Sequence, residues 1–140
     1  MDYGELAWND DLAMKLKGLT PSLKTKDIKG TVDFYVRVLG FTIDTLWPAD
    51  NPTLCILDHG DVHLSFAVDT NGWYADDPCL TGQLWIDVED VMALHAKVAG
   101  SVAIEWGPEV YPYGRREFAI KDPNGYLLAF SERTTDPPDC

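Results

Sequence analysis

The sequence predicts an α+β fold in which one order of elements, strand–helix–strand–strand–strand, occurs twice. The first helix is predicted over residues 28–39, where apolar side chains recur at helical spacing after Asp27, a favourable N-cap residue. The second helix is predicted between Asp90 and Gly100, with its apolar residues on one side. The motif Asp122-Pro123-Asn124-Gly125 lies between two apolar runs and predicts a closing hairpin, because Pro presets the turn and Asn-Gly tolerates positive φ.

Short runs of alternating apolar and polar residues supply the strands. The strands are predicted over residues 19–25, 41–47, 53–57 and 62–68 in the first copy and over 82–88, 102–106, 116–121 and 126–132 in the second. Gly107-Pro108 is predicted to open a loop that contains Tyr111 and Tyr113. Neither copy looks able to bury its sheet alone, so the two copies are expected to form one domain.

The domain is predicted over residues 18–134, with modules at about 18–68 and 81–132. Residues 1–17 are interpreted as an N-terminal extension, either a helix that packs on the domain or on a partner subunit, or a partly disordered segment. The segment between the modules reads as a linker, although it contains Trp73 and Tyr74. Residues 135–140 form a polar tail.

Composition limits the classes of partner. The net charge is −12, which argues against nucleic acid because phosphate binding needs a basic face. The acidity either attracts a cationic ligand or serves solubility alone. Cys55, Cys79 and Cys140 are odd in number and form no CxxC motif, so a disulfide framework is not expected. No apolar run approaches the ~20 residues of a membrane span, and the start lacks a signal-peptide pattern, so a cytoplasmic location is expected.

Several motifs together resemble one known superfamily. Residues 113–132, with the wording Gly-Arg-Arg-Glu-Phe-Ala-Ile-Lys-Asp-Pro-Asn-Gly, resemble the last hairpin of the vicinal-oxygen-chelate superfamily and are closest to its bleomycin-resistance branch. That superfamily holds glyoxalase I, extradiol dioxygenases, fosfomycin-resistance enzymes and bleomycin-resistance proteins. The segments that resemble its other elements are 23–28, 32–35, 38–41 and 85–91. The resemblance implies two curved sheets around a cleft, and a homodimer with its clefts at or near the subunit interface.

The resemblance also implies where a catalytic metal would be held. In the superfamily's enzymes, His, Gln and Glu on four cleft-facing strand positions hold a divalent ion. These positions fall on Thr20, Ser65, Gln83 and Ala129. Only Gln83 could serve as a ligand, and adding His63 from the same face as Ser65 would still supply no carboxylate. We therefore expect no metal, no cofactor and no catalytic residue.

Aromatic and polar residues of the predicted cleft are the candidates for ligand binding. Planar side chains can hold a flat or cationic ligand with few rotatable bonds. The candidate residues are Trp47, His63, Ser65, Gln83, Trp85, Trp106, Tyr111 and Tyr113. Trp85 and Tyr113 also match aromatic positions of the bleomycin-resistance branch. The alternative for each tryptophan is a place in the core. Arg115 and Glu117 are interpreted as a salt bridge or a solvated edge.

Three functions are compatible with these patterns. The first is a non-enzymatic protein that sequesters a cationic or aromatic small molecule, such as a bleomycin-type glycopeptide, in a dimer cleft. The second is a glyoxalase- or dioxygenase-type lyase or oxidoreductase with atypical metal ligands. The third is a structural or regulatory module with a vestigial cleft. The residues at Thr20, Ser65 and Ala129 favour the first over the second.

Overall fold

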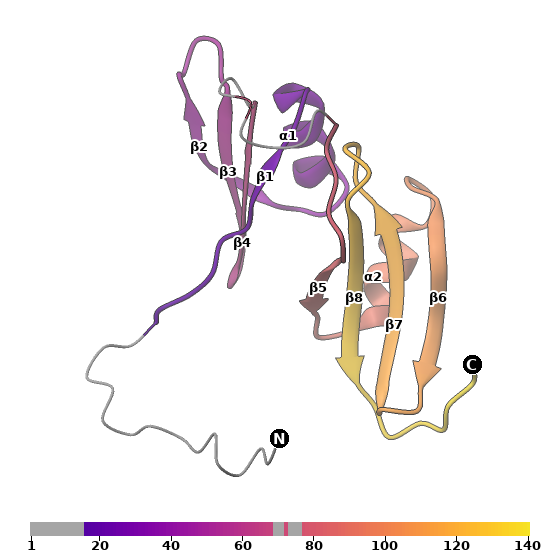
Figure 1. Ribbon diagram of the computed structural model, residues 1–140. Coiled ribbons are helices and arrows are strands. Elements are labelled where there is room, and N and C mark those ends of the chain that lie inside the picture. The colour runs from indigo at the N-terminus through magenta and orange to yellow at the C-terminus, as the bar shows by residue number, and fades with distance from the viewer. Residues whose placement is uncertain (1–15, 69–71, 73–76) are drawn as a thin grey trace, which may run out of the picture.

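The computed structural model describes residues 16–68, 72 and 77–140 (Figure 1). Nearly all of the predicted N-terminal extension, together with Trp73 and Tyr74, lies outside the described residues. Of the helices in the described part of the chain, none combines the length and hydrophobicity that a membrane crossing needs.

Both modules have the predicted element order. The first contains β1 (Ser22–Lys24), α1 (Ile28–Arg37), β2 (Thr42–Trp47), β3 (Leu54–His59) and β4 (Val62–Ala67). The second contains β5 (Leu84–Asp87), α2 (Val91–Val98), β6 (Ile104–Tyr111), β7 (Arg115–Lys121) and β8 (Leu127–Arg133). Each module forms a four-stranded mixed sheet, in the orders β1-β4-β3-β2 and β5-β8-β7-β6. The prediction of an α+β fold made of two such modules is confirmed.

The helix starts are the predicted ones. The side chains of Asp27 and Asp90 accept hydrogen bonds from the amides of Gly30 and Ala93, at 2.9 and 3.0 Å. Each bond satisfies one of the amides that a helix N-terminus leaves without an intrahelical partner. Strand β1 is shorter than predicted, because residues 18–20 have no strand partner among the described residues.

The predicted loop after Trp106 is wrong, because strand β6 continues through Gly107-Pro108 to Tyr111. Two register shifts absorb the irregularity, one between Ile104 and Trp106 and one that spans Gly107-Pro108, between Trp106 and Glu109. Gly107 has φ +78°, and a Cβ there would lie 2.3 Å from the carbonyl oxygen of Glu117. Glycine therefore allows β6 and β7 to approach closely, and the strand carries Tyr111 onto the sheet.

Each helix packs on one face of its own sheet, and the helix-bearing faces share one apolar core. The turn between β7 and β8 reaches this core from the second module. There the hydroxyl of Tyr126 donates to the carbonyl oxygen of Lys24 at 2.7 Å, and Asn124 Nδ2 donates to Thr31 Oγ1 at 3.1 Å. The closing hairpin thus joins the two modules.

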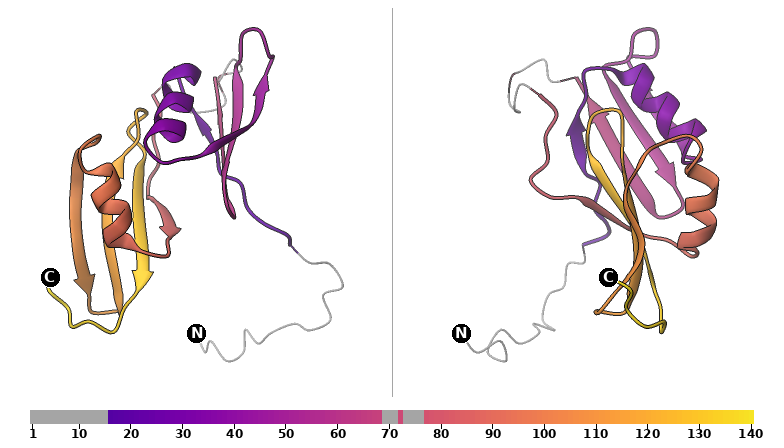
Figure 2. Two further views of the ribbon diagram at one scale, coloured as in Figure 1. Left: turned by 180° about the vertical axis from the view of Figure 1, so that it is seen from behind. Right: turned by 90° about the vertical axis from the view of Figure 1, so that its right-hand side faces the viewer.

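The other face of each sheet carries no helix, and we call it the open face. Helix α1 lies between its own sheet and the second sheet in Figure 1 and in the left view of Figure 2. The open face of the first sheet therefore points away from the second sheet. Within one chain the sheets do not close on each other, so the cleft implied by the resemblance is not enclosed by a single chain.

Candidate functional site

The open face of the second sheet gathers most of the predicted ligand-binding residues. Alternation along β7 and β8 places Phe118 and Phe130 in the core. The residues directly before and after each phenylalanine in its strand lie on the opposite face. The cross-strand pairs Trp85–Ala129, Ala119–Trp106 and Arg115–Tyr111 then align three predicted aromatic residues on that face. Gln83 is exposed and directly precedes β5, two residues before Trp85.

A single carboxylate lies at the centre of these aromatic residues. Glu117 Oε2 accepts hydrogen bonds from Trp85 Nε1 and from Ser131 Oγ, both at 2.8 Å. Its Oε1 accepts from the Tyr113 hydroxyl at 2.7 Å. The Glu117 side chain is almost fully buried, at 2% exposed, and these three donors compensate for its loss of hydration. The interpretation of Glu117 as a solvated edge residue is wrong.

Arg115 contacts three residues around Glu117, namely Ser131, Asp87 and Trp85. Its Nε donates to Ser131 Oγ at 2.5 Å, and its guanidinium also forms an ion pair with Asp87. The Arg115 Cζ lies 4.7 Å from the centre of the Trp85 ring, which is the geometry of a cation–π contact. Arg115 is buried, whereas Asp87 is largely exposed. The predicted salt bridge exists for Arg115, but it is part of a network that orders Trp85.

Two tyrosines extend the aromatic surface beyond Trp85. The rings of Tyr111 and Tyr113 are stacked, with centroids 5.5 Å apart and planes 5° apart, and Trp106 meets Tyr111 edge-on at 6.1 Å. Desolvation and the hydrogen bond to Glu117 raise the pKa of Tyr113 to about 12. Desolvation and the nearby Glu109 carboxylate raise the pKa of Tyr111 to about 12. Both hydroxyls therefore keep their protons at neutral pH, and Tyr113 remains a donor to Glu117.

The remaining predicted residues lie on the open face of the first sheet. Trp47 is 62% exposed at the end of the edge strand β2. His63 Nδ1 lies 2.6 Å from Asp58 Oδ1, which orients the imidazole. Ser65 is next to Ser22 in the parallel pair of β1 and β4 and is buried. The structure thus distributes the predicted site over two faces that do not oppose each other in one chain.

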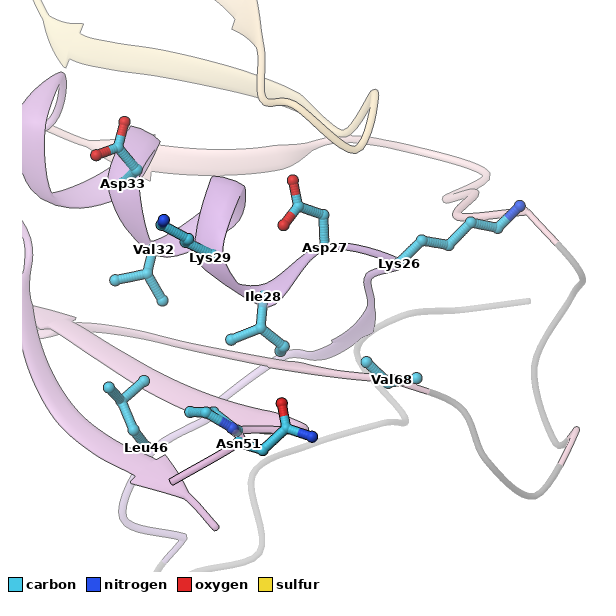
Figure 3. A pocket seen from close by; sticks show the side chains of 10 residues that line it. Lys26, Asp27, Ile28, Lys29, Val32, Asp33, Leu46, Asn51 and Val68 are labelled. Atoms are coloured by element: carbon cyan, nitrogen blue, oxygen red, sulfur yellow. The ribbon is translucent and has the colours of Figure 1, made fainter. Parts of the chain in front are cut away.

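A pocket lies elsewhere, beside the first turns of α1 (Figure 3). It has a volume of about 570 Å³. Its lining residues are Lys26, Asp27, Ile28, Lys29, Val32, Asp33, Leu46, Asn51, Pro52 and Val68. The lysines and aspartates balance in charge, and Lys26 is paired with Asp77 at 2.5 Å. Among the residues that the structure describes, the lining includes no predicted site residue, no aromatic ring and no histidine, so the open face of the second sheet is the better candidate.

The comparisons with known proteins bear on the family and the fold. The model of the glyoxalase/bleomycin resistance protein/dioxygenase superfamily matches residues 20–130. This chain belongs to that superfamily. The superfamily resemblance of the hairpin and of the preceding motifs is thereby confirmed.

Solved structures of the superfamily's fold are similar over most of the chain. The bleomycin-binding protein from bleomycin-producing Streptomyces verticillus, solved with copper(II)-bleomycin, is 28% identical, with 88% of this chain and 99% of that chain covered and a TM-score of 0.62. TnmS3, an antibiotic-binding protein from Streptomyces sp. CB03234, is 22% identical, with 88% and 99% covered and a TM-score of 0.70. TioX from Micromonospora sp. ML1 is 24% identical, with 84% and 98% covered and a TM-score of 0.70. No curated protein matches the sequence.

The positions that carry metal ligands in enzymes of the superfamily do not suit a metal here. Ala129 is fully buried beside Trp85 and offers only a methyl group. Ser65 and Thr20 offer neutral hydroxyls, and Gln83 offers one amide. Within residues 16–68, 72 and 77–140, no three His, Cys, Asp or Glu side chains are grouped as a divalent ion would require. The donor set of this chain does not fit the superfamily's metal.

Sequence reasoning did not predict the roles of the polar members of the cluster. Glu117, Arg115, Ser131 and Asp87 all lie on the same face of the second sheet as Trp85. The signal that could have found them is alternation, because residues 115, 117 and 131 share the parity of the open-face positions in their strands. Alternation assigns a face, but it does not show that a carboxylate on that face is covered by aromatic rings.

Proposed function

We propose that this protein is a non-enzymatic small-molecule-binding protein that sequesters a cationic or aromatic ligand. The observation that carries the proposal is the cluster of Trp85, Tyr111 and Tyr113 around the buried Glu117 carboxylate. Aromatic rings offer a large contact area at a small cost in side-chain entropy. Acidic residues around them favour a ligand that carries positive charge.

The binding unit in this proposal is a homodimer. In one chain the open face of the first sheet, whose strands carry Trp47 and His63, points away from the second sheet, whose strand β5 carries Trp85 (Figure 2). A second copy could place its first sheet over the second sheet of its partner, which would form two equivalent clefts by two-fold symmetry. Each cleft would then contain all of the residues predicted from the sequence.

The names of two similar structures support the class of ligand. One is a bleomycin-binding protein and another is an antibiotic-binding protein. A bleomycin-type glycopeptide combines flat heteroaromatic rings with a cationic group, which are the two features that the cluster can bind. We therefore propose a ligand of this type, held by stacking and kept from its target by sequestration.

Isothermal titration of the purified protein with metal-free bleomycin and with copper(II)-bleomycin tests the proposal. We expect saturable binding at one ligand per chain, and a dimer in native mass spectrometry. The Trp85→Ala variant is the matched control and should not bind. Turnover of a glutathione hemithioacetal or a catechol, or stoichiometric metal in protein purified without chelators, would contradict the proposal and favour an enzyme.

A further inference from the structure

We propose that Glu117 is a positioning residue, which holds the rings of Trp85 and Tyr113 for a flat ligand without touching that ligand itself. The proposal rests on the proposed binding function and assigns separate roles to the aromatic rings and to the carboxylate. The ring faces would make the contact, and the carboxylate would determine where the rings lie.

The accessibility of the three side chains supports this division. Glu117 is 2% exposed, so a ligand on the open face does not reach its carboxylate. Trp85 is 53% exposed and Tyr113 is 63% exposed, so their rings are available. Exposed rings of this size would otherwise sample several rotamers, and ordering them on binding would weaken the affinity.

The hydrogen bonds explain how one carboxylate orders both rings. Trp85 comes from β5, whereas Tyr113 comes from the turn between β6 and β7. The two oxygens of Glu117 receive one ring each, with Trp85 on Oε2 and Tyr113 on Oε1. Charge-assisted hydrogen bonds of 2.7–2.8 Å are stronger and more directional than neutral ones. The rings are therefore held in place before any ligand arrives.

Arg115 and Ser131 complete the arrangement from the protein side. Ser131 donates to Glu117 and accepts from Arg115, so the carboxylate is itself held in one orientation. Arg115 covers one face of Trp85, which leaves the other face for a ligand. A ligand that binds through ring faces needs a flat π system, and its positive charge would be a secondary feature. An uncharged flat molecule should thus depend on Glu117 as strongly as a cationic one.

The first test needs no ligand. In ¹H–¹⁵N spectra the five tryptophans give five indole signals, and Trp85→Phe identifies the signal of Trp85. Glu117→Gln should shift that signal upfield and speed its exchange with water by about 10-fold or more, because the charged acceptor is lost. Glu105→Gln is the matched control, because it removes the same charge from an exposed position of the neighbouring strand β6. An unchanged Trp85 signal in Glu117→Gln would overturn the proposal.

The second test uses two flat dyes that share a skeleton, cationic thioflavin T and uncharged 2-(4-dimethylaminophenyl)benzothiazole. Glu117→Gln should weaken both by about 10-fold or more at low and at high salt, whereas Glu105→Gln should weaken only the cation, by about 3-fold or less. A loss in Glu117→Gln confined to the cation and abolished by salt would show direct charge contact and overturn the proposal.

Two further measurements separate failure of the proposal from failure of Glu117→Gln to fold and from failure of the protein to bind a ligand. If Glu117→Gln does not fold by near-ultraviolet circular dichroism, Tyr113→Phe removes only the Oε1 hydrogen bond at an exposed position. That variant should weaken both dyes, and unchanged affinity for both would overturn the proposal. Failure of the wild type to bind either dye or bleomycin would overturn the proposed function, and the Trp85 indole signal would still decide whether Glu117 positions the ring.

Discussion

The hydroxyl of Tyr35 on α1 donates a 2.9 Å hydrogen bond to Oδ2 of Asp122, which lies 87 residues later in the turn after β7. Both side chains are buried. The other oxygen of Asp122 accepts from the amides of Asn124 and Tyr126, both at 2.9 Å. One carboxylate therefore shapes the closing turn and attaches it to the first module. A substitution at Asp122 should therefore weaken the contact between the two modules.

The first prediction concerns the pH dependence of Asp122→Asn. Burial raises the pKa of Asp122, although its hydrogen bonds oppose the shift. The folded state therefore holds the Asp122 proton more tightly than the unfolded state, whose pKa is about 4. As the pH rises from about 4 through the raised pKa, Asp122 contributes less to the free energy of unfolding. The wild type's advantage over Asp122→Asn should be largest near pH 4 and shrink toward pH 7 in urea titrations.

The control for this prediction is Tyr35→Phe. It removes one buried hydrogen bond but keeps the carboxylate, so we expect a loss of about 1.5 kcal/mol with the pH dependence retained. An advantage over Asp122→Asn that is constant or grows with pH would contradict the assigned role of burial.

The second prediction concerns close strand packing at Gly107. An alanine there would need φ +78° and would place its Cβ 2.3 Å from the Glu117 carbonyl oxygen and 2.9 Å from Phe118 Cα. Both neighbours are backbone atoms, so relief requires the strands to move apart. We expect Gly107→Ala to cost about 3 kcal/mol or more in thermal or urea unfolding.

The matched control for Gly107→Ala is Gly125→Ala. Gly125 has φ +87°, but no atom lies within 4 Å of its would-be Cβ. Only the backbone penalty remains, and we expect about 1 kcal/mol. Equal costs for the two variants would show that the approach of β6 to β7 is not what makes glycine necessary at position 107.

The sequence allowed the helices, the closing turn and the element order to be predicted, because these depend on local patterns such as the caps at Asp27 and Asp90. Strand β6 was cut short because Gly107-Pro108 is typical of loops, and only pairing with β7 shows that the strand continues. The role of Glu117 also could not be predicted. It depends on Trp85 from a strand that is two positions away in the sheet.

The third prediction separates a binding role of Trp85 from a core role. The Trp85 ring is about half exposed, and its loss would leave Glu117 accessible to water and still bonded to Ser131. We expect Trp85→Ala to abolish bleomycin binding at a cost of less than about 1.5 kcal/mol in folding stability. Phe118→Ala, at a fully buried position, should cost about 3–5 kcal/mol. A similar cost for Trp85→Ala would mean that Trp85 belongs to the core.

The fourth prediction tests whether two chains build each cleft. Trp47 belongs to the first sheet and Trp85 to the second, and the open faces of the two sheets do not oppose each other in one chain (Figure 2). If each cleft combines the first sheet of one chain with the second sheet of its partner, Trp47→Ala and Trp85→Ala homodimers each lose both sites. A mixed dimer of the two variants would contain one cleft with both tryptophans and one cleft with neither. Unfolding the two variants together and refolding them should then restore bleomycin binding to about one site per mixed dimer, which is half a site per chain.

The result of this mixing experiment discriminates between two architectures. If each cleft were formed within one chain, every cleft of the mixed dimer would lack one tryptophan, and mixing would restore nothing. Refolding each variant alone is the control, since neither should regain binding. Native mass spectrometry of differently tagged chains should confirm that mixed dimers formed, so that an absence of binding in their presence would rule out the shared cleft.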